Sequence, residues 1–85
     1  MGNAVLTLYS RPECHLCDDM KGIVEPVAQE LGCSLDAVDI SGNRDLEALY
    51  GTEVPVLMIN GRKAFKYRLT ERALRKRLRA SARQA

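Results

Sequence analysis

The chain has 85 residues, enough for one domain with a single hydrophobic core and too few for a second domain. Apolar residues make up 46% of it and charged residues 28%, shares that are ordinary for a water-soluble globular protein. No apolar run approaches the ~18 residues of a membrane-spanning helix, so we expect no membrane partner. The net charge of +2 is unevenly spread: residues 1–61 hold three basic and ten acidic side chains, residues 62–85 ten basic and one acidic.

The N-terminal residues, MGNAVLTLYSR, place no positive charge ahead of a short apolar run that alternates like a strand. This pattern argues against a secretory signal, and we therefore expect the protein in the cytoplasm. A disulfide framework normally uses an even and denser set of cysteines than the three found here. The cysteines therefore indicate redox chemistry or metal binding.

The first half of the chain predicts a strand, a helix, a strand and a short helix. Residues 4–10 (AVLTLYS) are typical of a buried strand that ends at Arg11-Pro12. Apolar residues then recur at steps of three and four through residues 16–31, which predicts a helix that Gly32 ends. Residues 34–40 (SLDAVDI) predict the second strand. The short helix carries Leu46, Leu49 and Tyr50 on one face, and Gly51 ends it.

The second half predicts a hairpin and a basic helix within the same domain, which spans residues 1–85. Residues 54–59 (VPVLMI) form an apolar strand, and Asn60-Gly61 is a strong signal for a tight turn into the antiparallel return strand RKAFKY. The last segment, residues 70–85, predicts a helix with Thr70 as its N-cap and basic residues towards its C-terminal end.

Cys14 and Cys17 stand where the first strand gives way to the first helix. Unpaired N–H groups at a helix N-terminus stabilise a thiolate, which is the reacting form of cysteine. Three residues apart on a helix, the two side chains fall on the same side. We therefore expect Cys14 to attack a disulfide and Cys17 to resolve the mixed disulfide that results.

Two other uses of these residues stay open. A zinc site normally takes four ligands, and the cysteine loop offers at most three, so we expect no metal in a single chain, although two chains could share a cluster. The alternative function is a non-catalytic binding module that docks a protein or nucleic acid through its basic C-terminal helix. Nucleic acid is disfavoured because no aromatic residues interleave with the charges.

The stretches LTLYSRPECHLC and EVPVLMING make the chain resemble the glutaredoxin-like proteins, and in particular a small group that carries C-H-L-C followed by acidic residues. The resemblance covers residues 3–80. It implies an α/β, thioredoxin-like fold with a four-stranded mixed sheet flanked by helices. It also implies a thiol-disulfide oxidoreductase, which we expect to be a monomer without a bound cofactor. Its partners would be a disulfide-containing client protein and a reductant, either glutathione as co-substrate or a thioredoxin-reductase-like protein.

The resemblance also supplies substrate-binding candidates. It implies a cis bond between Val54 and Pro55 that faces Cys14, with the backbone of Val54 pairing with the substrate. Arg11 matches a position that contacts glutathione in glutaredoxins. His15 is a further candidate, although an exposed histidine without a chemical role is an equal alternative.

Two departures from the glutaredoxin pattern bear on glutathione. Glu53 stands where glutaredoxins have Thr before the Val-Pro pair. The region Phe65-Lys66-Tyr67-Arg68 lacks the Gly-Gly pair that lets the backbone approach the tripeptide. The use of glutathione therefore stays open at this point.

Overall fold

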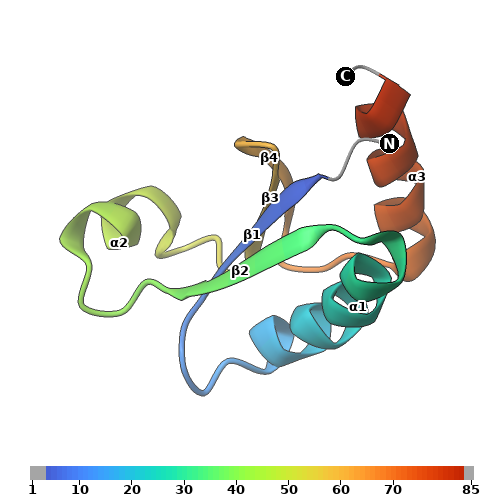
Figure 1. Ribbon diagram of the computed structural model, residues 1–85. Helices are drawn as coiled ribbons and strands as arrows, with labels where there is room; N and C mark the ends of the chain where they lie inside the picture. Colours follow the sequence, from blue (N-terminus) through green and yellow to red (C-terminus); the bar gives the residue numbers. More distant parts are fainter. Residues whose placement is uncertain (1–3, 84–85) are drawn as a thin grey trace.

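The seven predicted elements are present in the predicted order in the computed structural model, which describes residues 4–83 (Figure 1). Their bounds are β1 (Val5–Ser10), α1 (His15–Leu31), β2 (Ser34–Asp39), α2 (Arg44–Tyr50), β3 (Val56–Ile59), β4 (Arg62–Lys66) and α3 (Glu71–Arg83). The prediction for the last helix included residues 84 and 85, which lie outside the described residues. None of the helices within residues 4–83 is long and apolar enough to cross a membrane.

The four strands form one mixed sheet in the order β2-β1-β3-β4. β1 pairs with β2 in parallel, and α1 makes the crossover that a parallel pair requires. β1 and β3 are antiparallel, as are β3 and β4. The turn between the last two strands holds Asn60 (φ 52°) and Gly61 (φ 81°), and positive φ at both positions is what an Asn-Gly hairpin turn adopts.

Four strand ends differ from the prediction. β1 begins one residue later than predicted, and β2 ends one residue earlier. β3 begins at Val56 instead of Val54, because Pro55 has no N–H to donate to the ladder and the N–H of Val54 donates to the carbonyl of Tyr50 (3.1 Å). β4 ends at Lys66, because Tyr67 takes a left-handed backbone conformation (φ 68°) that a strand cannot continue.

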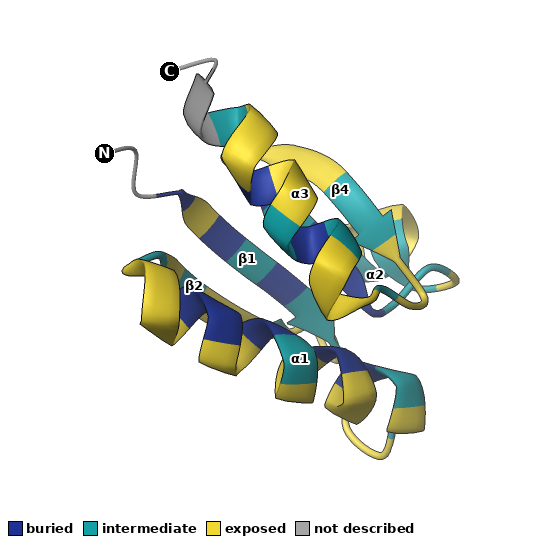
Figure 2. Cartoon of the chain, turned by 90° about the vertical axis from the view of Figure 1, so that its right-hand side faces the viewer, coloured by how far each residue is buried: buried dark blue, intermediate teal, exposed yellow. Residues whose placement is uncertain are grey.

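The core lies between the sheet and the two long helices. Figure 2 shows the buried stripes of α1 and α3 facing β1, with exposed residues on the opposite side of each helix. The largest of the fully buried side chains in this core are Leu6, Leu8, Met20, Val24, Val27, Leu57 and Leu74. Burial of each contributes about 1.5–3 kcal/mol, so this packing fixes α1 and the cysteines at its start.

α2 is held differently, since none of its residues is buried. It lies at the end of the sheet where β1 and β2 finish (Figure 1). The ring of Tyr50 stacks on that of Tyr9 in β1, with ring centres 4.6 Å apart. Asn43 caps the helix by accepting the N–H of Leu46 (3.0 Å). α2 therefore depends on a few specific contacts, one of which belongs to the site described next.

Candidate active site

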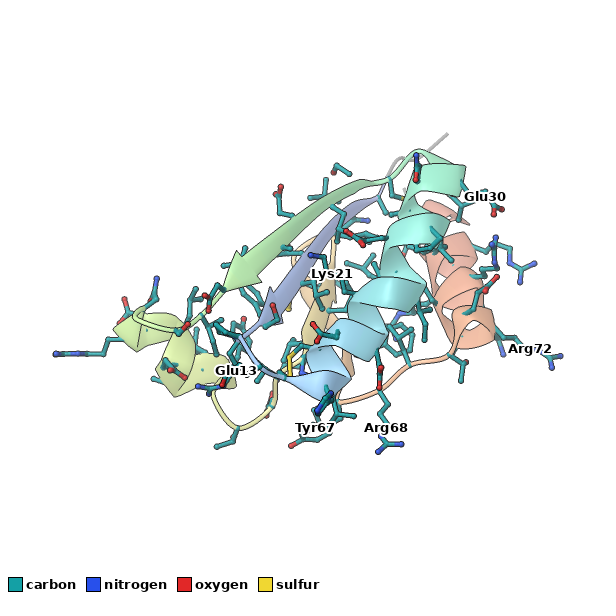
Figure 3. All side chains as sticks on the ribbon, turned by 90° about the horizontal axis from the view of Figure 1, so that it is seen from below. Glu13, Lys21, Glu30, Tyr67, Arg68 and Arg72 are labelled. Atoms are coloured by element: carbon teal, nitrogen blue, oxygen red, sulfur yellow. A yellow bond between two sulfur atoms is a disulfide. The ribbon has the colours of Figure 1, made fainter. Side chains whose placement is uncertain are left out.

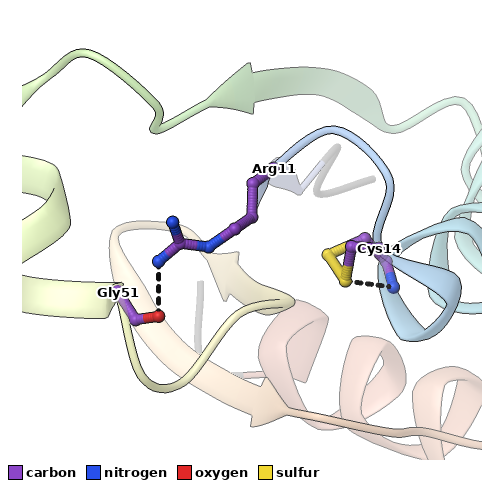
Figure 4. Close-up of a disulfide and its surroundings, with 4 residues drawn as sticks. Arg11, Cys14 and Gly51 are labelled. Atoms are coloured by element: carbon purple, nitrogen blue, oxygen red, sulfur yellow. Dashed lines mark hydrogen bonds between the residues drawn. A yellow bond between two sulfur atoms is a disulfide. The ribbon is translucent and has the colours of Figure 1, made fainter.

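The two cysteines lie at the start of α1, as predicted. Cys14 is the N-cap residue, with an extended backbone (φ −116°, ψ 109°), and its Sγ accepts the N–H of Cys17 at 3.1 Å. Cys14 and Cys17 form a disulfide, with Cα atoms 5.2 Å apart (Figure 4). The first sulfur thus occupies the place where Ser or Asp normally caps a helix, against backbone N–H groups.

The exposure of the two sulfur-bearing residues is unequal. Cys17 is buried, with 3% of its surface exposed, whereas Cys14 is half-buried and reachable from solvent. Cys14 is therefore more open than Cys17 to a molecule that approaches from solvent. The roles of attacking and resolving cysteine, which would suit this asymmetry, stay a prediction.

The chain reaches Cys14 through a tight loop after β1. Pro12 and Glu13 form this loop, and Glu13 adopts a positive φ of 58° that costs a non-glycine residue about 1 kcal/mol or more. The amide of Asp18 then donates to the carbonyl of Cys14 (3.0 Å) and closes the first helical turn. The loop and the turn together present the sulfur pair at the end of the sheet.

Val54 and Pro55 lie at the same end of the sheet as this loop. Their peptide bond is cis, which confirms what the resemblance implied. The next residue, Val56, pairs with Tyr9 near the end of β1, so the cis bond lies at the end of the sheet from which the chain runs to Cys14. The carbonyl of Pro55 accepts the N–H of Tyr67 at 2.9 Å. Pairing of Val54 with a substrate stays a prediction.

Arg11, which was predicted to contact the substrate, forms contacts with other residues of this chain. Its guanidinium forms a bidentate ion pair with Glu47 of α2 (3.1 and 2.7 Å) and donates to the carbonyl of Gly51 (2.6 Å; Figure 4). Arg11 therefore connects the cysteine loop to α2 and to the segment that leads into Val54. Its contact with glutathione stays a prediction, as does any substrate contact of His15, which is exposed at the first position of α1.

The departures from the glutaredoxin pattern have visible consequences. Glu53 forms ion pairs with Lys63 and with Lys66 (3.9 Å) of β4. The hydrogen bond from Lys63, aided by both lysine charges, holds the pKa of Glu53 below its usual value. Tyr67 carries a full side chain at a left-handed position that glycine would favour, and its hydroxyl donates to the carbonyl of Thr52 (3.1 Å).

A groove runs along the exposed side of the cysteine turn. It has a volume of about 480 Å³, and most of the residues that line it are apolar. The residues lining it are Leu16, Asp19, Met20 and Ile23 of α1 together with Tyr67, Arg68 and Leu69. Leu16 lies between the two cysteines in sequence, so one end of the groove lies at the first turn of α1.

Three contributors to this region were not predicted: Glu47, Gly51 as a hydrogen-bond acceptor, and Tyr67. No local sequence signal marks them, because each acts through a contact with a distant segment. Within residues 4–83, no group of three or more His, Cys, Asp or Glu side chains is arranged to hold a metal ion.

Comparison with known proteins agrees with this geometry. The model of the glutaredoxin-like domain family (DUF836) matches residues 5–79. A protein from X. campestris, known from its crystal structure, is 39% identical in sequence to this chain. The two structures superpose with a TM-score of 0.71, and the match covers 88% of this chain and 96% of that one. The solution structure of a protein from Nitrosomonas europaea is 26% identical, with a TM-score of 0.75 and coverage of 91% and 93%.

A thioredoxin from Fasciola hepatica shares the fold at 23% identity, with a TM-score of 0.65 and coverage of 93% of this chain and 81% of that one. The predicted thioredoxin-like α/β fold is thus confirmed by the sheet order, the helices and these structures. The pair formed by Cys14 and Cys17 on this fold is consistent with a redox function. The chain belongs to the glutaredoxin-like domain (DUF836) family.

Proposed function

We propose that this protein is a thiol-disulfide oxidoreductase that reduces protein or mixed disulfides with Cys14 and Cys17. The observation that carries the proposal is the N-cap position of Cys14. Its sulfur accepts the N–H of Cys17 and is accessible, while the sulfur of Cys17 lies bonded to it and buried. A nucleophile held at a helix N-terminus beside a shielded second thiol suits two-step disulfide exchange.

In the first step, the Cys14 thiolate forms a bond to one sulfur of the client disulfide. The client's S–S bond breaks, and its other sulfur leaves as a thiolate that takes a proton from solvent. The backbone N–H of Cys17 and the other free N–H groups of the first turn of α1 stabilise the attacking thiolate.

In the second step, the Cys17 thiolate attacks Cys14 Sγ and breaks the mixed disulfide. The second client sulfur leaves and is protonated, so the client gains two electrons and two protons while Cys14 and Cys17 become the disulfide. In the product disulfide the Cα atoms are 5.2 Å apart, within the 4.4–6.8 Å range of ordinary disulfides.

The client is a disulfide-containing protein that would pair with the backbone of Val54. The Val54 N–H already donates to Tyr50, so the carbonyl of Val54 is the group that would accept from the client. The reductant is glutathione or a thioredoxin-reductase-like protein, which returns two electrons to the Cys14–Cys17 disulfide without a bound cofactor. A reducing compartment such as the cytoplasm supplies either donor.

The test is a redox titration of the purified protein in glutathione buffers, with the state of each cysteine read by mass. We expect a reversible Cys14–Cys17 disulfide with a midpoint of roughly −270 to −120 mV, unchanged in a Cys33→Ser control. A glutathione adduct on Cys14 would indicate that the protein also uses glutathione as a co-substrate. Two cysteines that stay reduced across the series would refute the proposal and leave the binding module as the better reading.

A further inference from the structure

α3 carries three exposed cationic side chains on one side. Arg72, Lys76 and Arg79 are spaced four and three residues apart, which places them along one face of a helix. Together with Ala80 they line one shallow depression of about 460 Å³. We call Arg72, Lys76 and Arg79 the basic face.

The basic face is not neutralised within the described part of the chain. The ion pairs of α3 there involve Arg75, which binds Glu30 of α1 (2.9 Å) and Glu71 (2.9 Å). Like charges three and four residues apart destabilise a helix by roughly 0.2–0.5 kcal/mol per pair. The basic face thus keeps a local repulsion that an anionic partner would relieve.

Arg68 lies between the groove and the start of the basic face along the chain. Arg68 is exposed and lines the same groove as Leu16, which lies between Cys14 and Cys17 in sequence. It precedes Arg72 by four residues, and Figure 3 shows the two arginines along the same side of the molecule. A client chain lying in the groove would contact Arg68, four residues before the basic face begins at Arg72.

We propose that Arg68 and the basic face bind acidic residues that flank the reactive cysteine of the client, so that the protein selects acidic polypeptides. This inference rests on the proposed function, since it names the client class for the same site. Arg72 and Arg79 are separated by seven residues of helix, about 10 Å. An extended peptide covers that distance in three to four residues, so a short acidic run suffices.

A polypeptide fits these features better than a nucleic acid. The groove that Arg68 lines is formed mostly by apolar residues, which suit aliphatic side chains rather than phosphates. The sequence of α3, ERALRKRLRASAR, holds no aromatic residue on which a base could stack. Disulfides, the substrates of the proposed reaction, are carried by polypeptides.

The test compares three synthetic peptides, each with one cysteine held as a mixed disulfide with 2-mercaptoethanol. The residues three to six positions on either side of the cysteine are Asp and Glu in the first peptide, Ser in the second and Lys in the third. Reduced protein is mixed with each peptide and released peptide thiol is measured over a single turnover. We expect the acidic peptide to react about 10-fold faster than the lysine peptide, with the ratio falling towards one at 0.5 M salt.

Two triple variants with the same change in net charge locate the effect. Arg72→Glu, Lys76→Glu and Arg79→Glu together should abolish or invert the acidic-to-lysine ratio. Lys21→Glu, Arg44→Glu and Arg62→Glu, all exposed and on other elements, should preserve most of it. An equal loss of the ratio in both variants, or no preference in the natural sequence, would overturn the inference.

A binding measurement separates this inference from the proposed function. The protein with both Cys14 and Cys17 replaced by Ser cannot exchange disulfides, yet it should still bind a fluorescent acidic peptide more tightly than the lysine peptide. Failure of every peptide to be reduced would refute the proposed function alone. Tighter binding of a labelled oligonucleotide than of the acidic peptide would overturn the choice of partner.

Discussion

Arg11 and Glu47 form a bidentate ion pair across 36 residues of sequence, with nitrogen to oxygen distances of 2.7 and 3.1 Å. The pair joins the loop before Cys14 to α2, which buries none of its own residues. The position of α2, and of the segment from Gly51 to the cis bond, therefore depends on this contact and on the stacking of Tyr50 on Tyr9.

We predict that Glu47→Gln lowers the free energy of unfolding by about 1 kcal/mol. The side chains of Arg11 and Glu47 are about one-third exposed (34% and 37%). We therefore expect their ion pair to contribute a free energy near the upper end of the range for surface ion pairs. Urea denaturation measures the change. Glu25→Gln on the exposed side of α1 is the control and should change stability by less than ~0.5 kcal/mol. Equal effects of the two substitutions would show that the Arg11 contact is not what holds α2.

Two glycines should respond oppositely to alanine. At Gly51 a Cβ would lie 2.5 Å from the Glu47 carbonyl oxygen and 3.2 Å from Nη2 of Arg11. Gly51→Ala should therefore destabilise the protein by about 1–3 kcal/mol. At Gly22, exposed inside α1, a Cβ meets nothing within 4 Å, so Gly22→Ala should stabilise the protein by about 0.5–1 kcal/mol. Thermal unfolding of both variants tests these two predictions. A change of stability in the same direction in both variants would contradict them.

Local sequence signals were sufficient for the parts of the fold that short segments determine. The Asn60-Gly61 turn, the helical period of α1 and the cysteines at its N-terminus follow from neighbouring residues alone. The sequence also indicated that Gly51 ends α2, and the structure confirms this end. Gly51 is not in the left-handed conformation of a typical glycine cap (φ −54°, ψ −33°), and it is the close approach of Glu47 and Arg11 that leaves no space for a side chain.

Contacts between distant segments could not be predicted in this way. Arg11 was expected to face substrate, and its internal partners lie 36 and 40 residues further along the chain. Arg75 meets Glu30 across 45 residues. A charged side chain has many candidate partners in a sequence that is 28% charged. Only the placement of the helices and strands decides which partner it meets. The contacts of Arg11 and Arg75 could therefore not be predicted from the sequence.

Cys17→Ser should stop the reaction at the mixed disulfide between Cys14 and the client. The serine hydroxyl cannot attack Cys14 Sγ, so the adduct accumulates where the natural sequence would release it. Non-reducing electrophoresis and mass spectrometry measure the adduct. Cys14→Ser should form at least ~10-fold less adduct, because Cys17 is buried. Adding Cys33→Ser to Cys17→Ser should leave the yield unchanged, and a loss there would point to Cys33 as the reacting thiol.

The ion pairs of Arg75 should give the stability a measurable dependence on pH. The hydrogen bonds and charge of Arg75 hold the pKa of Glu30 below its usual value of 4.5. In turn, the carboxylates of Glu30 and Glu71 raise the pKa of Arg75. A carboxyl whose pKa is lowered by folding contributes stability that is fully present above the unfolded pKa. That contribution is lost as the pH falls through the folded pKa. The natural protein should therefore lose stability from about pH 5 downward.

Glu30→Gln removes this titrating group and should reduce the slope of stability against pH below about pH 5. The urea midpoint measured between pH 3 and pH 6 tests this, with Glu25→Gln as a control on the same helix. Salt at about 1 M should shrink the difference, since Glu30 is well exposed and the pair is screened. Parallel pH profiles for Glu30→Gln and the natural protein would mean that Arg75 does not hold α1 and α3 together in solution.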